Sequence, residues 1–354
     1  MDALRLPLIA LILAMPLPRV AAADAAAADD SRVSGGGGWV FTSYAENDSN
    51  WAKPNNDSDE HYTNGLVLTL SSQPEFARDW AHALPLGPSP DTRVSAAAGL
   101  LFGHLMFTSQ NIEDPTPSMD DRPYAGYLFG GAYWQRAWQE LGNPRVATFD
   151  HIQLELGVIG PSSLAADVQE SVHESFAGIE PEGWDTQLED EFAIQAYLRR
   201  KWRFDLDEPG GWDVQVIPGI GAAVGLVHRH LEAGATLRGG WNLPDDFGPG
   251  RLADFKAATG DRPGNGWGFY VYGRAAGRAV EHNVFLEGSN YHDSPGVEPE
   301  PLVGEVEAGV RIAWHGDCWG LEFGYGQTFQ TREFKTERGT DSRGAYTASL
   351  FFLF

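Results

Sequence analysis

Strict alternation of apolar and polar residues over segments of ten or more residues is the feature that most constrains this chain. In the segment 302–314 the even-numbered and odd-numbered positions differ in character. One face carries Leu302, Gly304, Val306, Ala308, Val310, Ile312 and Trp314, and the other carries Glu305, Glu307 and Arg311. A period of two is typical of a β-strand. A soluble sheet buries its apolar face, whereas a membrane β-barrel turns that face to lipid and lines its lumen with the polar one.

Composition favours the membrane barrel. The chain contains 42 glycines, 19 phenylalanines, 12 tryptophans and 11 tyrosines, a mixture expected for a barrel with aromatic girdles. It ends in an alternating strand whose last residue is Phe354, which resembles the sorting signal of bacterial outer-membrane proteins. We therefore expect an all-β, transmembrane antiparallel barrel in the bacterial outer membrane.

The first residues predict export. Arg5, the apolar run 6–17 and the small residues 20–23 form a signal peptide over residues 1–23. Residues 24–38 are rich in Ala, Asp and Gly and are expected to be a disordered mature N-terminus, followed by the barrel at 39–354. The lone Cys318 is expected to pack as a small residue. The net charge of −24 argues against a nucleic-acid partner.

Twelve alternating segments are expected to form the barrel, and an even number suits a bacterial single-chain barrel. They are 39–48, 61–72, 98–108, 124–138, 148–159, 188–203, 212–225, 228–241, 267–288, 302–314, 319–331 and 345–354. Parity favours reading 267–288 as one strand. With both termini in the periplasm, the connections 46–62, 109–123 and 160–187 lie outside the cell, and those at 73–97 and 242–266 lie inside.

The third outer connection is expected to contain a short helix. The preceding strand breaks at Gly160-Pro161, and Ser162 or Ser163 can cap a helix. Leu164, Val168 and Val172 share its apolar face, whereas Gln169 and His173 are four residues apart and share another.

The strand count brings the motifs in or beside the first three outer connections to one rim. Together with two later segments, they resemble the lipid A 3′-O-deacylase family over nearly the whole mature chain. The matching segments are Glu46-Asn47-Asp48, Tyr62-Thr63-Asn64-Gly65, Asp121-Arg122-Pro123-Tyr124-Ala125-Gly126, Gly157-Val158-Ile159-Gly160-Pro161 with Gln169 and His173, Gly183-Trp184-Asp185, Leu237 to Pro244, and Leu286-Glu287-Gly288.

The resemblance implies a twelve-stranded barrel with its active site near the extracellular surface, between the wall and a short loop helix. It implies calcium-dependent hydrolysis of the ester that holds the 3′-acyloxyacyl group of lipid A. The mechanism would be similar to that of secreted phospholipase A2, with the lipid A of lipopolysaccharide as substrate among the outer-membrane lipids.

Residue by residue, His173 matches the catalytic base, since a neutral imidazole can accept a proton from water at neutral pH. Asp48, Thr63 and Glu180 are expected to bind Ca²⁺ through hard oxygens, with Glu182 an open alternative to Glu180. Alternatively, both glutamates are solvent-exposed residues of an acidic extracellular loop and bind no ion.

Two further residues complete the predicted site. Asn47 matches a group that hydrogen-bonds the oxyanion or orients the water, although Asn is also common in turns. Arg122 matches a basic position that could hold a lipid A phosphate or stabilise the oxyanion; its structural alternative is pairing with Asp121. Gln169 could orient His173.

Two other functions are compatible with a barrel. An outer-membrane phospholipase or a deacylase with a Ser/His pair would need an exposed serine beside a histidine on the lipid-facing wall; the sequence has no Gly-x-Ser-x-Gly elbow. A non-enzymatic narrow pore would need an open lumen between the inward polar residues.

Overall fold

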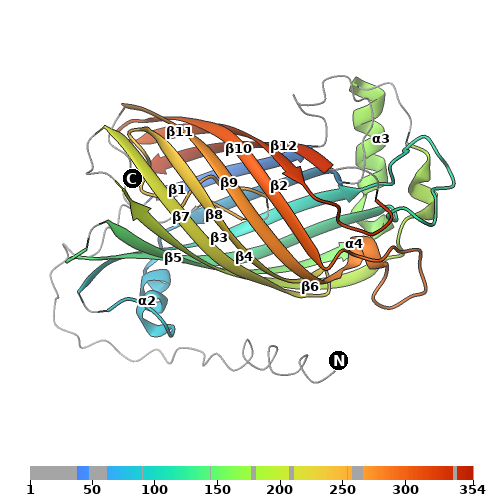
Figure 1. The fold of residues 1–354 in the computed structure, drawn as a ribbon, viewed down its shortest axis with the longest axis horizontal. Coiled ribbons are helices and arrows are strands. Elements are labelled where there is room, and N and C mark those ends of the chain that lie inside the picture. The colour runs from blue at the N-terminus through green and yellow to red at the C-terminus, as the bar shows by residue number, and fades with distance from the viewer. Residues whose placement is uncertain are drawn as a thin grey trace.

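A closed antiparallel barrel accounts for the fold (Figure 1). The computed structural model describes residues 38–47, 62–89, 91–143, 145–176, 181–206, 211–252, 254–256, 266–337 and 341–353. Within these ranges, twelve strands pair in chain order, and β1 pairs with both β2 and β12. The predicted strand number is confirmed. The segment 267–288 contains one strand, as parity favoured, but that strand ends at Asn283, and Val284–Glu287, capped by the Asn283 side chain, forms a helix instead.

The strands are β1 (Gly38–Asn47), β2 (Tyr62–Ser72), β3 (Thr92–Phe107), β4 (Ala125–Glu140), β5 (Val146–Ile159), β6 (Glu191–Asp205), β7 (Trp212–Gly225), β8 (His228–Trp241), β9 (Gly266–Asn283), β10 (Leu302–His315), β11 (Trp319–Gln330) and β12 (Asp341–Leu353). The helices are α2 (Glu75–Ala83), α3 (Ala165–Phe176) and α4 (Val284–Glu287), with 3-10 turns η3 (Pro161–Ser163) and η4 (Gly183–Thr186). Residues 1–37, which carry the predicted signal peptide and N-terminal segment, lie outside the described residues.

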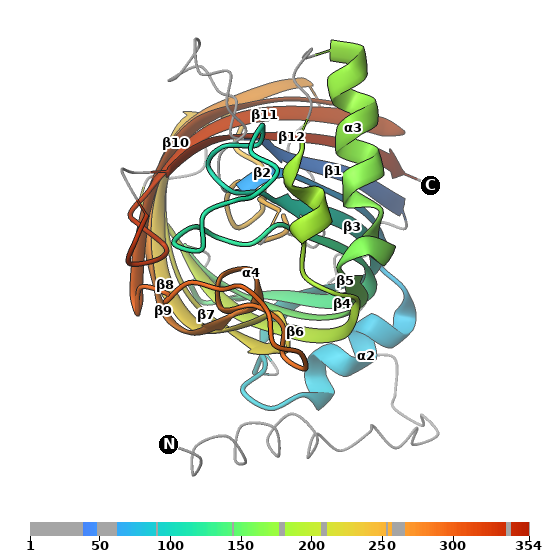
Figure 2. The same cartoon turned by 90° about the vertical axis from the view of Figure 1, so that its right-hand side faces the viewer.

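The two ends of the barrel differ. One end, which we call the outer mouth, carries α3, η4 and α4; the other, the inner mouth, carries α2 and the C-terminus (Figures 1 and 2). Sequence patterning missed α2. This helix packs Ala77 and Ala81 against Val94 and Ala96, which explains why β3 begins at Thr92 rather than near residue 98. In the described part of the chain, no helix has the length and apolarity to cross a membrane.

The wall has the two faces that the alternation predicts. On β10, Leu302, Val306 and Val310 are 73, 54 and 52% exposed on the outside. Glu305, Glu307 and Arg311 face inward and are at most 7% exposed. The prediction for Cys318 is wrong: it is exposed, because it lies in the turn that joins β10 to β11.

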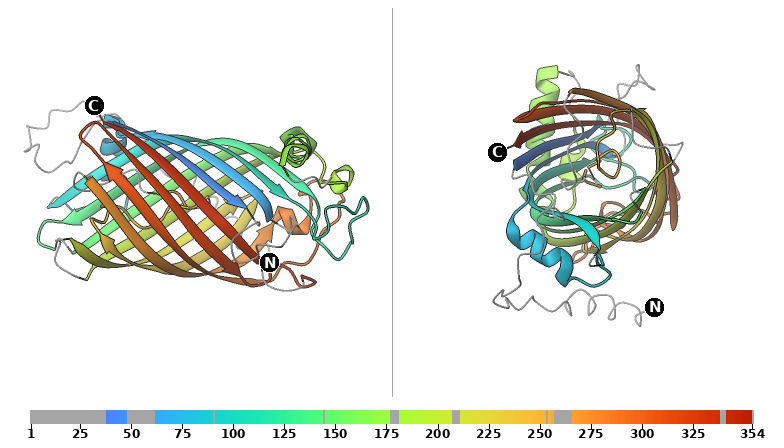
Figure 3. Two further views of the ribbon diagram at one scale, coloured as in Figure 1. Left: turned by 90° about the horizontal axis from the view of Figure 1, so that it is seen from above. Right: turned by 90° about the vertical axis from the view of Figure 1, so that its left-hand side faces the viewer.

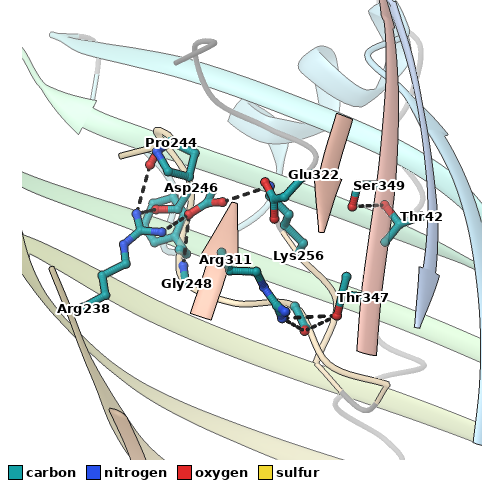
Figure 4. A network of polar contacts seen from close by, with 12 residues as sticks. Thr42, Arg238, Pro244, Asp246, Gly248, Lys256, Arg311, Glu322, Thr347 and Ser349 are labelled. Atoms are coloured by element: carbon teal, nitrogen blue, oxygen red, sulfur yellow. Dashed lines mark hydrogen bonds and ion pairs between the residues drawn. The ribbon is translucent and has the colours of Figure 1, made fainter. Parts of the chain in front are cut away.

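The lumen is occupied by the chain itself (Figures 3 and 4). The segment after β8 enters the barrel, where Asp246 pairs with Arg238 and Lys256 pairs with Glu322. Arg311 Nη2 donates to the Gly250 carbonyl at 2.9 Å. The sequence indicated only a polar periplasmic connection here; its charged residues instead pair with inward residues of several strands.

Candidate functional site

The ends of β1 and β2 at the outer mouth are joined by the residues that the motifs singled out. Asn47 Nδ2 donates to the Thr63 carbonyl at 3.1 Å. The Thr63 hydroxyl lies 2.7 Å from the Thr108 hydroxyl, and both threonines are at most 2% exposed. Two motifs that are 16 residues apart therefore meet at one rim, as the strand count predicted.

Cross-strand register places Asn47 on the outside of the wall. Asn47 pairs with Asn64, Asn64 with Met106, and Met106 with Gly126. We call these four positions the outer row. On β1, β2 and β3 the row lies an even number of residues from the exposed Phe41, Leu66 and Phe102, so its side chains point to the same face of the sheet as theirs. The outer row therefore faces away from the lumen.

The loop helix begins against this row. A Cβ on Gly126 would lie 2.0 Å from Ser163 Oγ and 2.4 Å from Ala165 Cβ, so the absence of a side chain lets η3 and α3 seat on β4. Gly160 donates its N–H to the Gly126 carbonyl at 3.1 Å and has φ of 100°, a value that favours glycine. The glycines of the two motifs thus fix the helix to the outside of the wall (Figure 2).

The predicted serine cap is wrong. Ser162 and Ser163 belong to η3, and α3 begins at Ala165 after Leu164, which has φ of 62°. Ser162 instead donates its N–H and hydroxyl to Asp190 at 2.7 and 2.6 Å. The chain therefore bends at Leu164, between η3 and α3, and the helical periodicity could not predict this bend.

A second contact holds α3 from the loop that follows it. Trp184 Nε1 donates to Gln169 Oε1 at 2.7 Å, and the Trp184 ring meets Tyr124 edge to face with centroids 5.2 Å apart. Gly183 packs on the Tyr124 ring, where a Cβ would lie 2.3 Å from the nearest ring atom. Gln169 therefore ties α3 to η4. His173 lies one turn further along α3, and its side chain is outside the described residues.

Arg122 lies on the other side of the wall. Its Nη2 donates to Glu333 Oε2 at 3.0 Å, and its guanidinium lies 5.2 Å from the centroid of Phe107, which stacks on Phe285 inside the outer mouth. The Asp121 carboxylate accepts from the Arg122 backbone N–H, so the charge partner is Glu333 and not Asp121. The structure does not bring Arg122 to Asn47, which faces outward.

The ion pair at the outer mouth is electrostatically strong. Burial raises the pKa of Glu333, but the charges of Arg122, Arg278 and Arg343 outweigh burial and lower that pKa to about 2. Glu333 is therefore ionised at neutral pH and holds the connection between β11 and β12 over the mouth.

Two predicted calcium ligands, Asp48 and Glu180, lie outside the described residues. Glu182 is described, and its backbone N–H donates to the Ile112 carbonyl at 2.8 Å. Across the described ranges, no three His, Cys, Asp or Glu side chains are grouped to hold a metal ion. Thr63 and the alternative ligand Glu182 are thus the predicted ligands whose positions are given.

Sequence reasoning missed two residues near the outer row. Asn64, the cross-strand partner of Asn47, stood in a quoted motif without a role. His104 lies on the outer face of β3, opposite Leu66 and one row nearer the inner mouth. The signal for His104 was available: an imidazole at an outward position of a strand that otherwise presents Leu100 and Phe102.

Comparisons with known proteins agree with this architecture. The family model "Outer membrane protein LpxR" matches residues 6–352. Comparison with curated protein sequences gave no match. LpxR from Salmonella typhimurium superposes with a TM-score of 0.66 at 19% identity, covering 89% of this chain and 100% of that one. The β domain of the Bordetella autotransporter Brka superposes with a TM-score of 0.54 at 10% identity, covering 90% and 100%. At these identities the structural likeness concerns the fold.

Proposed function

This chain belongs to the LpxR family of outer-membrane proteins, and on that basis we propose that it is a lipid A 3′-O-deacylase. It would hydrolyse the ester that holds the 3′-acyloxyacyl group of lipid A. The observation that carries the proposal is the outer row: Asn47 and the seat of the His173 helix lie on one outside face of the wall, at one mouth. A lipid ester embedded in the membrane can reach such a face without entering the lumen.

In the proposed reaction, His173 accepts a proton from water as the water oxygen attacks the ester carbonyl. The same imidazolium then returns the proton to the departing sugar 3′-oxygen, so the histidine is regenerated. Asn47 would donate to the carbonyl oxygen as it becomes negative. Its amide is already oriented by the Thr63 carbonyl, which limits the entropy lost on binding substrate.

The proposed donor set for calcium consists of oxygens only, which suits a hard cation. The Thr63 carbonyl accepts one hydrogen bond from Asn47 and retains a second lone pair. Thr63, Asp48 and Glu180, or Glu182 in place of Glu180, would hold the ion. A bound calcium ion would supply positive charge where the ester oxygen becomes negative.

Arg122 takes no part in the proposed chemical step. Arg122 is 1% exposed on the lumen side of the wall, and its guanidinium is paired with Glu333. We propose instead that Arg122 stabilises the outer mouth. It would thereby also fix the start of β4, where Tyr124 and Gly126 hold the loop helix.

The competing functions have weaker support. A pore needs an open lumen, whereas this lumen contains the segment with Asp246, Gly250 and Lys256. His104 and Ser163 are a neighbouring histidine and serine on the outer wall, but Ser163 is 1% exposed, so a substrate carbonyl cannot reach its hydroxyl.

Lipid A mass spectrometry tests the proposal. Cells that express the wild-type protein are expected to contain lipid A lacking the mass of the 3′-acyloxyacyl group. Asn47→Ala is expected to insert normally and leave most lipid A intact. A wild-type protein that is folded in the membrane, supplied with calcium, and leaves lipid A unchanged would overturn the proposal, and conductance in planar bilayers would then favour the pore.

A further inference from the structure

A hollow of about 710 Å³ lies on the outside of the wall between β1 and β9. Its volume falls within the range of roughly 300–1,000 Å³ that ligand pockets occupy. The hollow exists because three outward positions carry small side chains, Ser43, Ala45 and Ala348, among larger neighbours.

Strand register gives the shape of the hollow. Two adjacent cross-strand rows of outward residues form its floor. The row nearer the outer mouth consists of Ala45, Tyr346, Tyr325, Val310 and Val271. The next row consists of Ser43, Ala348, Phe323, Ile312 and Phe269. Neither row contains a charged side chain, and the lining is almost wholly apolar.

The hollow is continuous with the proposed active site. Ala45 is the outward position next to Asn47 on β1, two residues along the strand. Because the strands are inclined to the barrel axis, a cross-strand row that starts at β1 runs away from the outer mouth as it approaches β9 (Figures 1 and 3). The hollow therefore begins beside Asn47 and descends along the lipid-facing wall.

We propose that this hollow binds the fatty acyl chain carried at the 3′ position of the substrate, and so determines which chain lengths are hydrolysed. This inference rests on the proposed function. An acyl chain fits the observations because it is apolar, lies in the hydrocarbon layer, and is covalently attached to the carbonyl that must stand at Asn47. A charged ligand would find no oppositely charged side chain along the two rows, whose polar atoms are the hydroxyl groups of Ser43, Tyr325 and Tyr346.

The chemistry of the occupant sets the size of the effect. Because the acyl chain is surrounded by hydrocarbon before it binds, its methylene groups gain no hydrophobic free energy on entering the hollow, and a filled hollow acts through steric exclusion. Overpacking of this kind lowers affinity by roughly 5- to 150-fold. A long chain reaches the row of Ala348, which is about 14 Å along the strand from the position of Asn47, whereas a short chain does not.

The test is Ala348→Trp, which fills the deeper row with an indole beside Phe323. The matched control is Ala233→Trp, since Ala233 is also a small outward residue in a hollow of similar volume, about 690 Å³, but belongs to neither row. Both variants add the same side chain to the lipid-facing wall, so a general effect of a new tryptophan on insertion appears in both.

Purified protein in detergent micelles is given two lipid A preparations that differ in the length of the 3′ chain. Ala348→Trp is expected to lower kcat/KM for the long chain by about tenfold and to leave the short chain within about twofold of wild type. Ala233→Trp is expected to match wild type on both. If Ala348→Trp retains the wild-type ratio of long-chain to short-chain rates, the acyl-binding role is refuted while deacylation stands. If wild type releases no acyl group from either preparation, it is the proposed function that fails.

Discussion

A single methyl group on Gly126 is expected to unseat the loop helix without disturbing the barrel. In Gly126→Ala the added Cβ would lie 2.0 Å from Ser163 Oγ and 2.4 Å from Ala165 Cβ. The serine hydroxyl can rotate away, but the Ala165 Cβ is fixed to the backbone of α3. The first turn of α3 must therefore move away from the wall, and His173 moves with it.

The magnitude follows from the cost of overpacking. Inserting a methyl group into a well-packed contact costs about 1–3 kcal/mol. Since about 1.4 kcal/mol is tenfold in an equilibrium, the population with α3 seated against the outer row falls by roughly 5- to 150-fold. Deacylation in Gly126→Ala is expected to fall by about the same factor, because the proposed base is carried by the displaced helix.

Gly130→Ala is the matched control. Gly130 has the same outward parity on the same strand, but its nearest neighbour, the Leu101 carbonyl, would be an ordinary 3.8 Å from the new Cβ. Both variants are expected to show the heat-dependent gel migration of a folded barrel. Release of the 3′-acyloxyacyl group, measured by mass spectrometry, should fall in Gly126→Ala alone. Equal rates in the two variants would refute the reasoning that the seat of α3 controls the site.

Three further outcomes are expected. Arg238→Ala leaves Asp246 buried without its strongest partner, which costs about 3–5 kcal/mol, so the barrel should unfold at a lower temperature on heated gels; an unchanged transition would contradict the role of the lumen segment. Because the pKa of Glu333 lies below its ordinary value of 4.5, its contribution to closing the mouth is complete above about pH 4.5 and is lost as pH falls toward about 2. Pepsin cleavage of the wild-type outer loops should therefore accelerate between these values, whereas Glu333→Gln should be cleaved rapidly throughout. Trp184→Phe removes the donor to Gln169, which costs about 1–3 kcal/mol, and should lower deacylation by roughly 5- to 150-fold; a wild-type rate would show that this contact does not hold α3.

The barrel could be derived from the sequence because its physical signal repeats. Each strand alternates apolar and polar residues, and the even strand number limited the segment 267–288 to one strand, which is β9, although β9 ends at Asn283. The same count placed Asn47 near Thr63, and their hydrogen bond bears this out. The alternation within each strand and the requirement that the barrel closes were together sufficient to predict the strands of the wall.

Features that depend on side-chain packing between distant segments were beyond reach. Nothing in the polar stretch around Asp246 and Lys256 indicated that it turns into the lumen, since its partners Arg238 and Glu322 lie on two separate strands. Likewise, Arg122 carries the same charge whichever side of the wall it occupies. Its pairing with Glu333, 211 residues away, could not be derived from the motif.

The fine structure of the site lies between these cases. The break at Gly160 was visible in the sequence, but the bend at Leu164 was not, because αL geometry at a leucine has no sequence signature. The motif glycines were visible as a pattern, and the structure supplies their reason: Gly126 and Gly183 each lie where another segment approaches too closely for a side chain.

The most direct test of the central claim is the lipid A profile of cells expressing His173→Gln. This variant keeps a polar side chain of similar size in α3 but cannot accept and return a proton as imidazole does. We predict a folded barrel in the outer membrane, with lipid A that retains its 3′-acyloxyacyl group, beside wild-type cells whose lipid A has lost it. Lipid A deacylated by His173→Gln to the wild-type extent would contradict the account.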